Sequence, residues 1–235
     1  MEPHRPGPMA TRPTLAYLMD PRFRGGTSSS FAEEIKVTTE MARVRVHALS
    51  GGRLRGLAPS PPAEAALANA GLNLQWDSPS ISADIVVIHN PLFLSPQGQL
   101  PTRITARDLV VVSHENFLRP GGHEAFDVTG VLNGIAASSF ALRRWIAPVS
   151  AYNRRMVNEW ITRSGTASGW QVLPEDWTNI LGGPMLAPTP APRDRRGRHS
   201  RAGLEKFPSP ETMAVLFPRH AEANVILGFG PFTQD

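Results

Sequence analysis

The sequence contains no cysteine, and it has no apolar run long enough to cross a membrane. Without cysteine the chain cannot form disulfides or use thiolates for metal binding or redox chemistry. A membrane-spanning helix needs about 20 consecutive apolar residues. The proline-rich segment 1–13 lacks the apolar region of a signal peptide, so we expect a disordered leader there. These absences favour a cytoplasmic protein, and they leave peripheral association at the inner face of the membrane open.

Positive charge in excess of negative charge is confined to one stretch. The 235 residues carry a net charge of +4, and the segment from Arg193 to Lys206 has six basic and two acidic side chains. This segment accounts for the whole excess, so the rest of the chain is balanced. Binding nucleic acid over the fold requires a broad basic face, so we expect no nucleic-acid partner. The segment itself fits a local anion site or a solvated linker.

Short apolar segments that end in polar residues alternate with segments of helical periodicity. The pattern predicts strands at residues 14–20, 43–49, 72–76, 84–90, 108–114, 145–149 and 170–173. It predicts helices at residues 27–42, 62–70 and 128–135, and a further helix that Ser150 caps. Ser30 and Glu33 fit a capping box for the first helix. This alternation predicts an α/β protein with a Rossmann-like parallel sheet and helices on both faces.

The composition changes near residue 182. Several prolines make residues 182–196 typical of a semi-rigid linker, and a polar loop is expected at 197–208. A helix at 211–217 and a strand at 224–227 follow, too few elements to enclose a core. We therefore expect one complete domain at 14–181 and the truncated start of a second Rossmann-like domain at 197–235.

Three polar clusters follow predicted strands, at residues 25–28, 89–90 and 113–116. Ligands of open parallel sheets bind beyond the carboxyl ends of the strands. Because the clusters come from separate segments but share one sheet edge, we expect them to form one site. No metal site is predicted, because His89, His114 and His123 lack a recognised ligand spacing.

Gly25 and Gly26 let backbone N–H groups at a helix N-terminus approach a ligand closely. A tight turn without a ligand is the alternative. A dinucleotide site is disfavoured, because the spacing is not G-x-G-x-x-G and the next strand ends at Leu49 rather than in an acid.

His89 and His114 could act as general bases or as hydrogen-bonding groups for a sugar, since neutral imidazole both donates and accepts. The alternative is that each is bonded to loop backbone. Glu115 could orient His114 or pair with an arginine. Arg198, Arg201 and Lys206 would suit a diphosphate, because arginine gives forked donors and lysine a point charge. The tryptophans are expected mostly in packing.

Several of these segments resemble GT-B glycosyltransferases of the large retaining, sugar-nucleotide-dependent family 4. The resemblance lies in segments 20–35, 83–91, 111–116, 147–154 and 197–206, and in their order along the chain. It implies two Rossmann-like domains and transfer of a hexose from a nucleotide-diphosphate sugar to a carbohydrate or lipid-linked acceptor. No cofactor is implied beyond that donor substrate.

Site residues follow from the same resemblance. Gly25 and Gly26 would line the cleft near the donor phosphates, together with Arg198 and Lys206, which would hold the diphosphate leaving group. His114 would be catalytic, facing the transferred sugar or the acceptor hydroxyl. The remaining edge residues would contact the acceptor: His89, Asn90, Glu115 and Asn116.

The family's paired glutamates would lie beyond Asp235, so we expect a truncated chain of doubtful activity alone. A second hypothesis is a non-catalytic glycan- or partner-binding module derived from such a domain. A third, a Rossmann oxidoreductase, predicts binding of a nicotinamide cofactor.

Overall fold

The computed structural model divides the chain into two compact units, residues 1–182 and 183–235, which are described separately. The described residues are 12–180 without 24, 53, 95–99, 101, 120 and 165–168, together with 195–199, 209–218 and 223–227. No described helix is long and apolar enough to span a bilayer.

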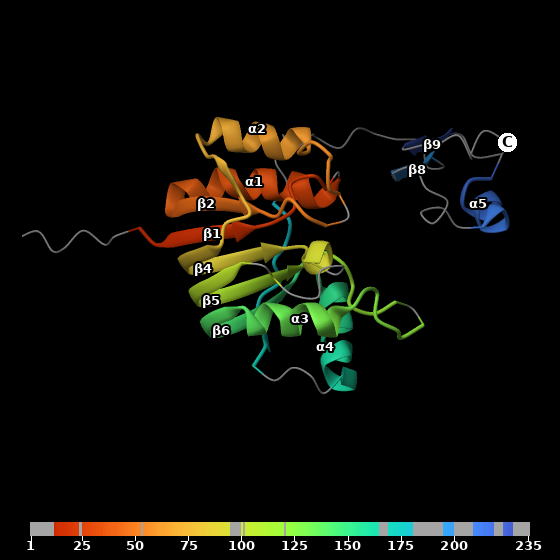
Figure 1. The fold of residues 1–235 in the computed structure, drawn as a ribbon. Coiled ribbons are helices and arrows are strands. Elements are labelled where there is room, and N and C mark those ends of the chain that lie inside the picture. The colour runs from red at the N-terminus through yellow and green to blue at the C-terminus, as the bar shows by residue number, and fades with distance from the viewer. Residues whose placement is uncertain are drawn as a thin grey trace, which may run out of the picture. The chain divides into compact units, whose positions relative to one another are not determined.

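The first unit is built on one seven-stranded sheet (Figure 1). Its strands are β1 (Thr14–Leu18), β2 (Arg43–Ala48), β3 (Leu74–Trp76), β4 (Ser80–His89), β5 (Arg103–Ser113), β6 (Ser139–Pro148) and β7 (Gln171–Val172). They lie in the order β3-β2-β1-β4-β5-β6-β7, and every pair is parallel. The predicted α/β class with a parallel sheet is therefore confirmed.

The strand order reverses between β1 and β4. From β1 the chain moves outward to β2 and β3, and it then returns to the other side of β1 and moves outward through β7. In the register Leu18 lies opposite both His47 and Ile88, and His89 lies opposite Val112. The carboxyl ends of the central strands therefore meet at one edge. Such a reversal leaves a crevice at that edge in which ligands of open α/β sheets bind.

Helices cover both faces of this sheet. The helical elements are α1 (Gly26–Met41), α2 (Pro61–Asn69), the 3₁₀ turn η1 (Pro91–Leu94), α3 (Val128–Ala137) and α4 (Ala151–Ser164). Phe31 of α1 and Leu67 of α2 pack on one face with Tyr17 and Val87. Elements η1, α3 and α4 cover the other face, where Trp160 belongs to the core. Figure 1 shows α1 and α2 together beside β1 and β2.

Three strands begin earlier than their apolar runs indicated. The predictions at residues 84, 108 and 145 miss the true starts at Ser80, Arg103 and Ser139. The first half of each strand alternates or mixes exposed and buried residues, whereas the second half is mostly buried. Only the buried half produces the continuous apolar run from which a parallel strand is recognised.

The first helix begins at a glycine turn and not at the predicted capping box. Gly25 is the N-cap, with φ +120°, and no side chain caps the helix. Ser30 lies inside α1, where its hydroxyl donates to Oδ1 of Asn179. A φ of this sign suits glycine, so the turn fixes the start of the helix before any serine is reached. The prediction for Ser150 is confirmed, since its Oγ accepts from the backbone N–H of Asn153.

The second unit contains β8 (Arg195–His199), α5 (Pro210–Leu216) and β9 (Ala223–Leu227). Strands β8 and β9 pair in parallel, with Arg198 opposite Ile226. The prediction of a loop from residue 197 and of a linker through 196 is wrong at these positions. An arginine-rich strand has no apolar alternation, so its sequence gives no strand signal. Ser209 caps α5 by accepting from the N–H of Thr212.

Candidate functional site

The reversal of strand order brings the three predicted clusters to one edge of the sheet. Gly25 and Gly26 form the turn after β1, His89 and Asn90 end β4, and His114 follows β5. Because β1, β4 and β5 are neighbours in the sheet, these segments lie side by side. The grouping expected from the order of elements is therefore present in the fold.

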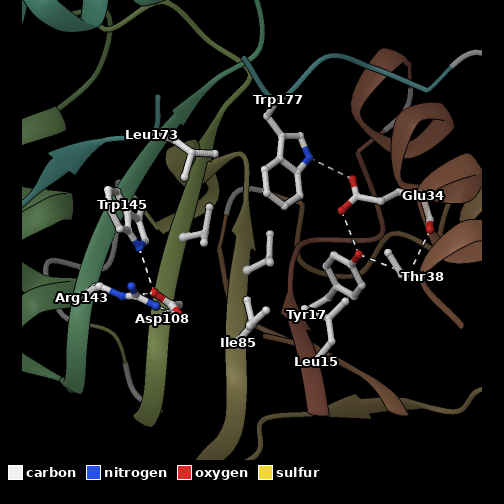
Figure 2. A pocket seen from close by; sticks show the side chains of 12 residues that line it. Leu15, Tyr17, Glu34, Thr38, Ile85, Asp108, Arg143, Trp145, Leu173 and Trp177 are labelled. Carbon is white, nitrogen blue, oxygen red and sulfur yellow. Dashed lines mark hydrogen bonds and ion pairs between the residues drawn. The ribbon is translucent and has the colours of Figure 1, made fainter. Parts of the chain in front are cut away.

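A chain of buried polar side chains runs from the interior to this edge. The hydroxyl of Tyr17 donates to Oε1 of Glu34 over 2.8 Å, and Oε2 of Glu34 lies 3.3 Å from Nε2 of His89. Nδ1 of His89 lies 2.9 Å from Nε2 of His114. The indole N–H of Trp177 also donates to Oε2 of Glu34 (Figure 2). Three elements, β1, α1 and β4, and the loops after β5 and β7 thus contribute to one array.

The contact between Glu34 and His89 has ion-pair distance but not hydrogen-bond alignment. Nε2 of His89 is buried and lacks an aligned hydrogen-bond partner among the described residues. At the 3.3 Å separation a small rotation of the ring would align an N–H on Nε2 with the carboxylate. Glu34 is thus a buried carboxylate that faces this nitrogen.

The surroundings shift the pKa of three groups in the array. Burial would raise the pKa of Glu34, but its interactions with His89, Tyr17 and Trp177 outweigh burial and lower that pKa. Burial and the neighbouring charge on His89 lower the pKa of His114 to about 3. Burial and the nearby carboxylate of Glu34 raise the pKa of Tyr17. Glu34 is therefore a carboxylate, and Tyr17 stays a donor, at neutral pH.

The two histidines differ in access. His89 is only 1% exposed, so its ring lies behind the edge and is not presented to a ligand as an acceptor-binding residue would be. His114 is partly exposed. Nε2 of His114 is used by His89, and no hydrogen bond within the described residues reaches Nδ1, so Nδ1 is the ring nitrogen of His114 that is left for a ligand.

Asn90 has an unusual backbone and an unsatisfied side chain. Its φ is +52°, in the left-handed region that asparagine tolerates better than most residues. The side chain is buried, and Oδ1 has no hydrogen-bond partner among the described residues. A buried amide oxygen of this kind calls for a water or ligand donor. Asn90 directly follows His89, so this unused acceptor lies at the same edge.

The glycine turn leaves open space at the start of α1. A side-chain carbon placed on Gly25 or Gly26 would meet no atom within 4 Å. Gly26 also borders a pocket of about 310 Å³ that Pro62 and Asn179 help to line. Exposed N–H groups at a helix N-terminus attract anions. The turn therefore offers room and donors for a phosphate or carboxylate.

Glu115 and Asn116 hold the loop after β5 in place. Nδ2 of Asn153, at the start of α4, donates to the backbone oxygen of Glu115 and to Oδ1 of Asn116 over 3.2 and 3.0 Å. The carboxylate of Glu115 is exposed and makes no described contact with His114. His89 therefore orients His114, which sequence reasoning had left between Glu115 and the backbone.

Sequence reasoning missed the residue that anchors the glycine turn. Arg22 is 3% exposed and makes a forked pair with Asp20 through Nε and Nη2, over 2.7 and 2.9 Å. Its guanidinium also donates to the backbone oxygens of residues 49, 50 and 51 after β2. One side chain thus joins the β1–α1 turn to the end of β2. The sequence does contain a signal for this ion pair, because Asp20 and Arg22 carry opposite charges and lie two residues apart just after a buried strand.

Arg198 and Lys206 belong to the second unit of the chain. Arg198 belongs to β8 of the second unit, and its side chain lies outside what the structure describes. Lys206 lies outside the described residues, as does Arg201. Within the described residues, no group of three histidine or acidic side chains could hold a metal ion.

A second pocket, of about 370 Å³, lies on the face of the sheet that carries α1 (Figure 2), and Tyr17 and Glu34 of the buried array line one side of it. Leu15, Val87 and Trp177 help to line it. On its far side Nε and Nη2 of Arg143 donate to Asp108 over 2.6 and 2.7 Å, and the indole of Trp145 donates to the same carboxylate. The polar groups around this pocket are therefore paired with one another.

Replacing Asp108 with asparagine is expected to cost stability at neutral pH. Hydrogen bonding from Arg143 is the main cause that lowers the pKa of Asp108 from 3.8 to about 2. Because the pKa of Asp108 is lower in the folded than in the unfolded state, its carboxylate stabilises the folded protein above pH 3.8. This contribution to stability disappears as the pH falls to about 2. The linkage amounts to about 1–2 kcal/mol, allowing for solvent around the half-exposed Arg143.

Urea unfolding of wild type and Asp108→Asn at several pH values tests this. The difference should be present at pH 7 and shrink between pH 4 and pH 2. Glu40→Gln, at an exposed site of α1, is the control. A difference that does not change with pH would contradict an electrostatic role for Asp108.

No family model matches this chain, and no curated protein matches it. The fold and the site define an α/β protein with a seven-stranded parallel sheet and polar residues gathered at its point of strand reversal.

Proposed function

We propose that this chain acts in glycosyl transfer, as the acceptor-side part of a GT-B enzyme that uses a nucleotide-diphosphate sugar. The observation that carries the proposal is the convergence at the β1/β4 reversal of an open glycine turn and the partly exposed His114. One element suits a diphosphate and the other a hydroxyl. The resemblance of segments 20–35 and 111–116 to family 4 enzymes supports the same function.

Each edge residue has a role in this proposal. Gly25 and Gly26 offer backbone N–H groups to the donor phosphates, and His114 faces the acceptor hydroxyl. Asn90, Glu115 and Asn116 border the acceptor, while His89 supports His114 from behind. Arg198 and Lys206 are proposed to hold the diphosphate, where negative charge grows in the transition state. Transfer of a hexose to a carbohydrate or lipid-linked acceptor is the reaction.

A pair of variants at Gly26 tests the proposed phosphate site. Gly26→Asp places a carboxylate in open space at the start of α1, where it repels a phosphate but suits the helix. Gly26→Asn has the same shape without the charge. For wild type we expect nucleotide-diphosphate sugars to bind in a panel with uracil, guanine, adenine and thymine bases, followed by ligand-observed NMR. Affinity should fall about tenfold in Gly26→Asp and much less in Gly26→Asn.

Release of nucleoside diphosphate on adding glycan acceptors is the second readout. A folded chain that binds no nucleotide sugar at millimolar concentration would overturn the proposal. Equal affinities of the two Gly26 variants for nucleotide sugars would show that the glycine turn does not bind the donor phosphates.

A non-catalytic glycan-binding module is the second candidate. The low pKa of His114 favours it, because burial and His89 keep this imidazole neutral, with Nδ1 left to form one hydrogen bond with a sugar hydroxyl. Glycan binding without any nucleotide-sugar binding would support the module.

A further inference from the structure

Glu34, His89 and Tyr17 are buried titratable groups that glycosyl transfer by an isolated His114 would not require. They come from α1, β4 and β1, and hydrogen bonds together with the 3.3 Å ion-pair contact between Glu34 and His89 link them to His114. Buried charges persist in proteins only when they are paired. Four such groups in one array that ends at the partly exposed residue His114 indicate a task beyond packing.

We propose that Glu34, His89 and His114 form a proton relay. A proton taken up at Nδ1 of His114 comes to rest on His89, against the carboxylate of Glu34. This inference rests on the proposed function for the source of the proton, an acceptor hydroxyl. In it His114 touches the substrate, and His89 and Glu34 are positioning residues.

The direction of the hydrogen bonds follows from the chemistry of the partners. The carboxylate of Glu34 can only accept, so the facing Nε2 of His89 carries a hydrogen. In neutral His89 the other nitrogen, Nδ1, then holds a lone pair. It accepts from Nε2–H of His114 over 2.9 Å. Nδ1 of His114 is left with a lone pair, and no described residue forms a hydrogen bond with this nitrogen.

The proton step balances within this arrangement. The acceptor O–H bond breaks, and its proton forms a bond to Nδ1 of His114. The hydrogen on Nε2 of His114 passes to Nδ1 of His89, so His114 is neutral again and His89 becomes an imidazolium. The acceptor oxygen bonds to the sugar's anomeric carbon as the diphosphate oxygen leaves with the electron pair. The stored proton returns through His114 to the diphosphate or to solvent.

The surroundings of His89 favour the charge there over His114. Glu34 faces it from α1 and is itself held by donors from Tyr17 on β1 and Trp177. Phe31, with its ring centroid 6.0 Å away, excludes water on the same side. Two other titratable groups face it, His114 and the ring of Tyr17, whose centroid is 5.6 Å away. A carboxylate within about 4–6 Å stabilises the charged form of a base, whereas no acidic side chain among the described residues forms a hydrogen bond or ion pair with His114.

The test is a ¹⁵N NMR titration of the histidine side chains in the whole chain, which needs no substrate. In wild type at neutral pH, His89 should be the Nε2–H tautomer and His114 should carry its hydrogen on Nε2. On acidification the pair of histidines should take up one proton. In Glu34→Gln the pH midpoint of this uptake by the pair should be lower than in wild type. Glu33→Gln, beside it on α1 and paired with the exposed Lys36, should leave the midpoint unchanged.

An Nδ1–H tautomer of neutral His89, or equal midpoints in the two glutamate variants, would overturn the relay. The wild-type tautomers decide the question even if Glu34→Gln does not fold. Where transfer activity is measured, the acid limb of its pH profile should move with the same midpoint. Failure of the proposed function would leave the NMR results intact, whereas failure of the relay alone would leave donor binding intact.

Discussion

Replacing Arg22 with alanine is expected to lower the free energy of unfolding by about 3–5 kcal/mol, the cost of breaking a buried ion pair from one side. Its guanidinium is almost fully buried and holds Asp20 as well as three backbone oxygens after β2. Alanine would leave the carboxylate of Asp20, itself 3% exposed, without its cation. It would also leave the carbonyl of Leu49, the acceptor of a buried hydrogen bond, without this donor.

Chemical unfolding followed by circular dichroism measures this loss. Arg22→Lys should recover only part of it, because an ammonium group cannot make the forked contact with Asp20 and reach the β2 loop as well. Arg55→Ala removes an exposed arginine from the neighbouring loop and should change stability by less than about 0.5 kcal/mol. Equal stabilities of Arg22→Ala and Arg55→Ala would refute the anchoring role. We expect the loss of stability in Arg22→Ala to disturb the glycine turn first, because Arg22 lies three residues before Gly25.

The sheet could be predicted from the sequence because its strands are buried on both faces. The continuous runs at Val86–Ile88 and Leu109–Val112 leave no polar face, and only a covered parallel sheet accommodates that pattern. The alternation of helices then fixed the direction of each strand. Strand starts were predicted poorly because exposure at residues such as Arg103 and Phe140 interrupts the apolar pattern.

The edge of the site could be predicted, but its internal connections could not. The order of elements brings His89 and His114 together, since strands end at one edge. Nothing in the spacing indicates that Glu34 points inward, because it sits among Glu33, Lys36 and Glu40 on a helix that reads as amphipathic. Its burial depends on Tyr17 and on Trp177, which lies 143 residues away in the sequence. Contacts of that separation are set by the packed fold.

Replacing His114 with glutamine is expected to lower kcat for the proposed transfer by about 10²–10⁴-fold, the usual contribution of a general base. Glutamine can still donate to and accept from a hydroxyl, so binding of the acceptor, and with it KM, should change little. Glutamine cannot take up a proton, so the proton of the acceptor hydroxyl can no longer pass to His89. His114→Ala should lose kcat equally and raise KM as well.

The pattern across variants separates a base from a binding group. His123→Ala, a histidine substitution in the loop before α3, is the control and should keep both parameters. Unchanged kcat with a raised KM in His114→Gln would mean that His114 binds the hydroxyl without accepting its proton. Loss of kcat together with loss of the acid limb of the pH profile would instead indicate that Glu34 and His89 take part in the proton transfer. In the relay the proton passes inward from His114, so activity depends on the charge state of His89.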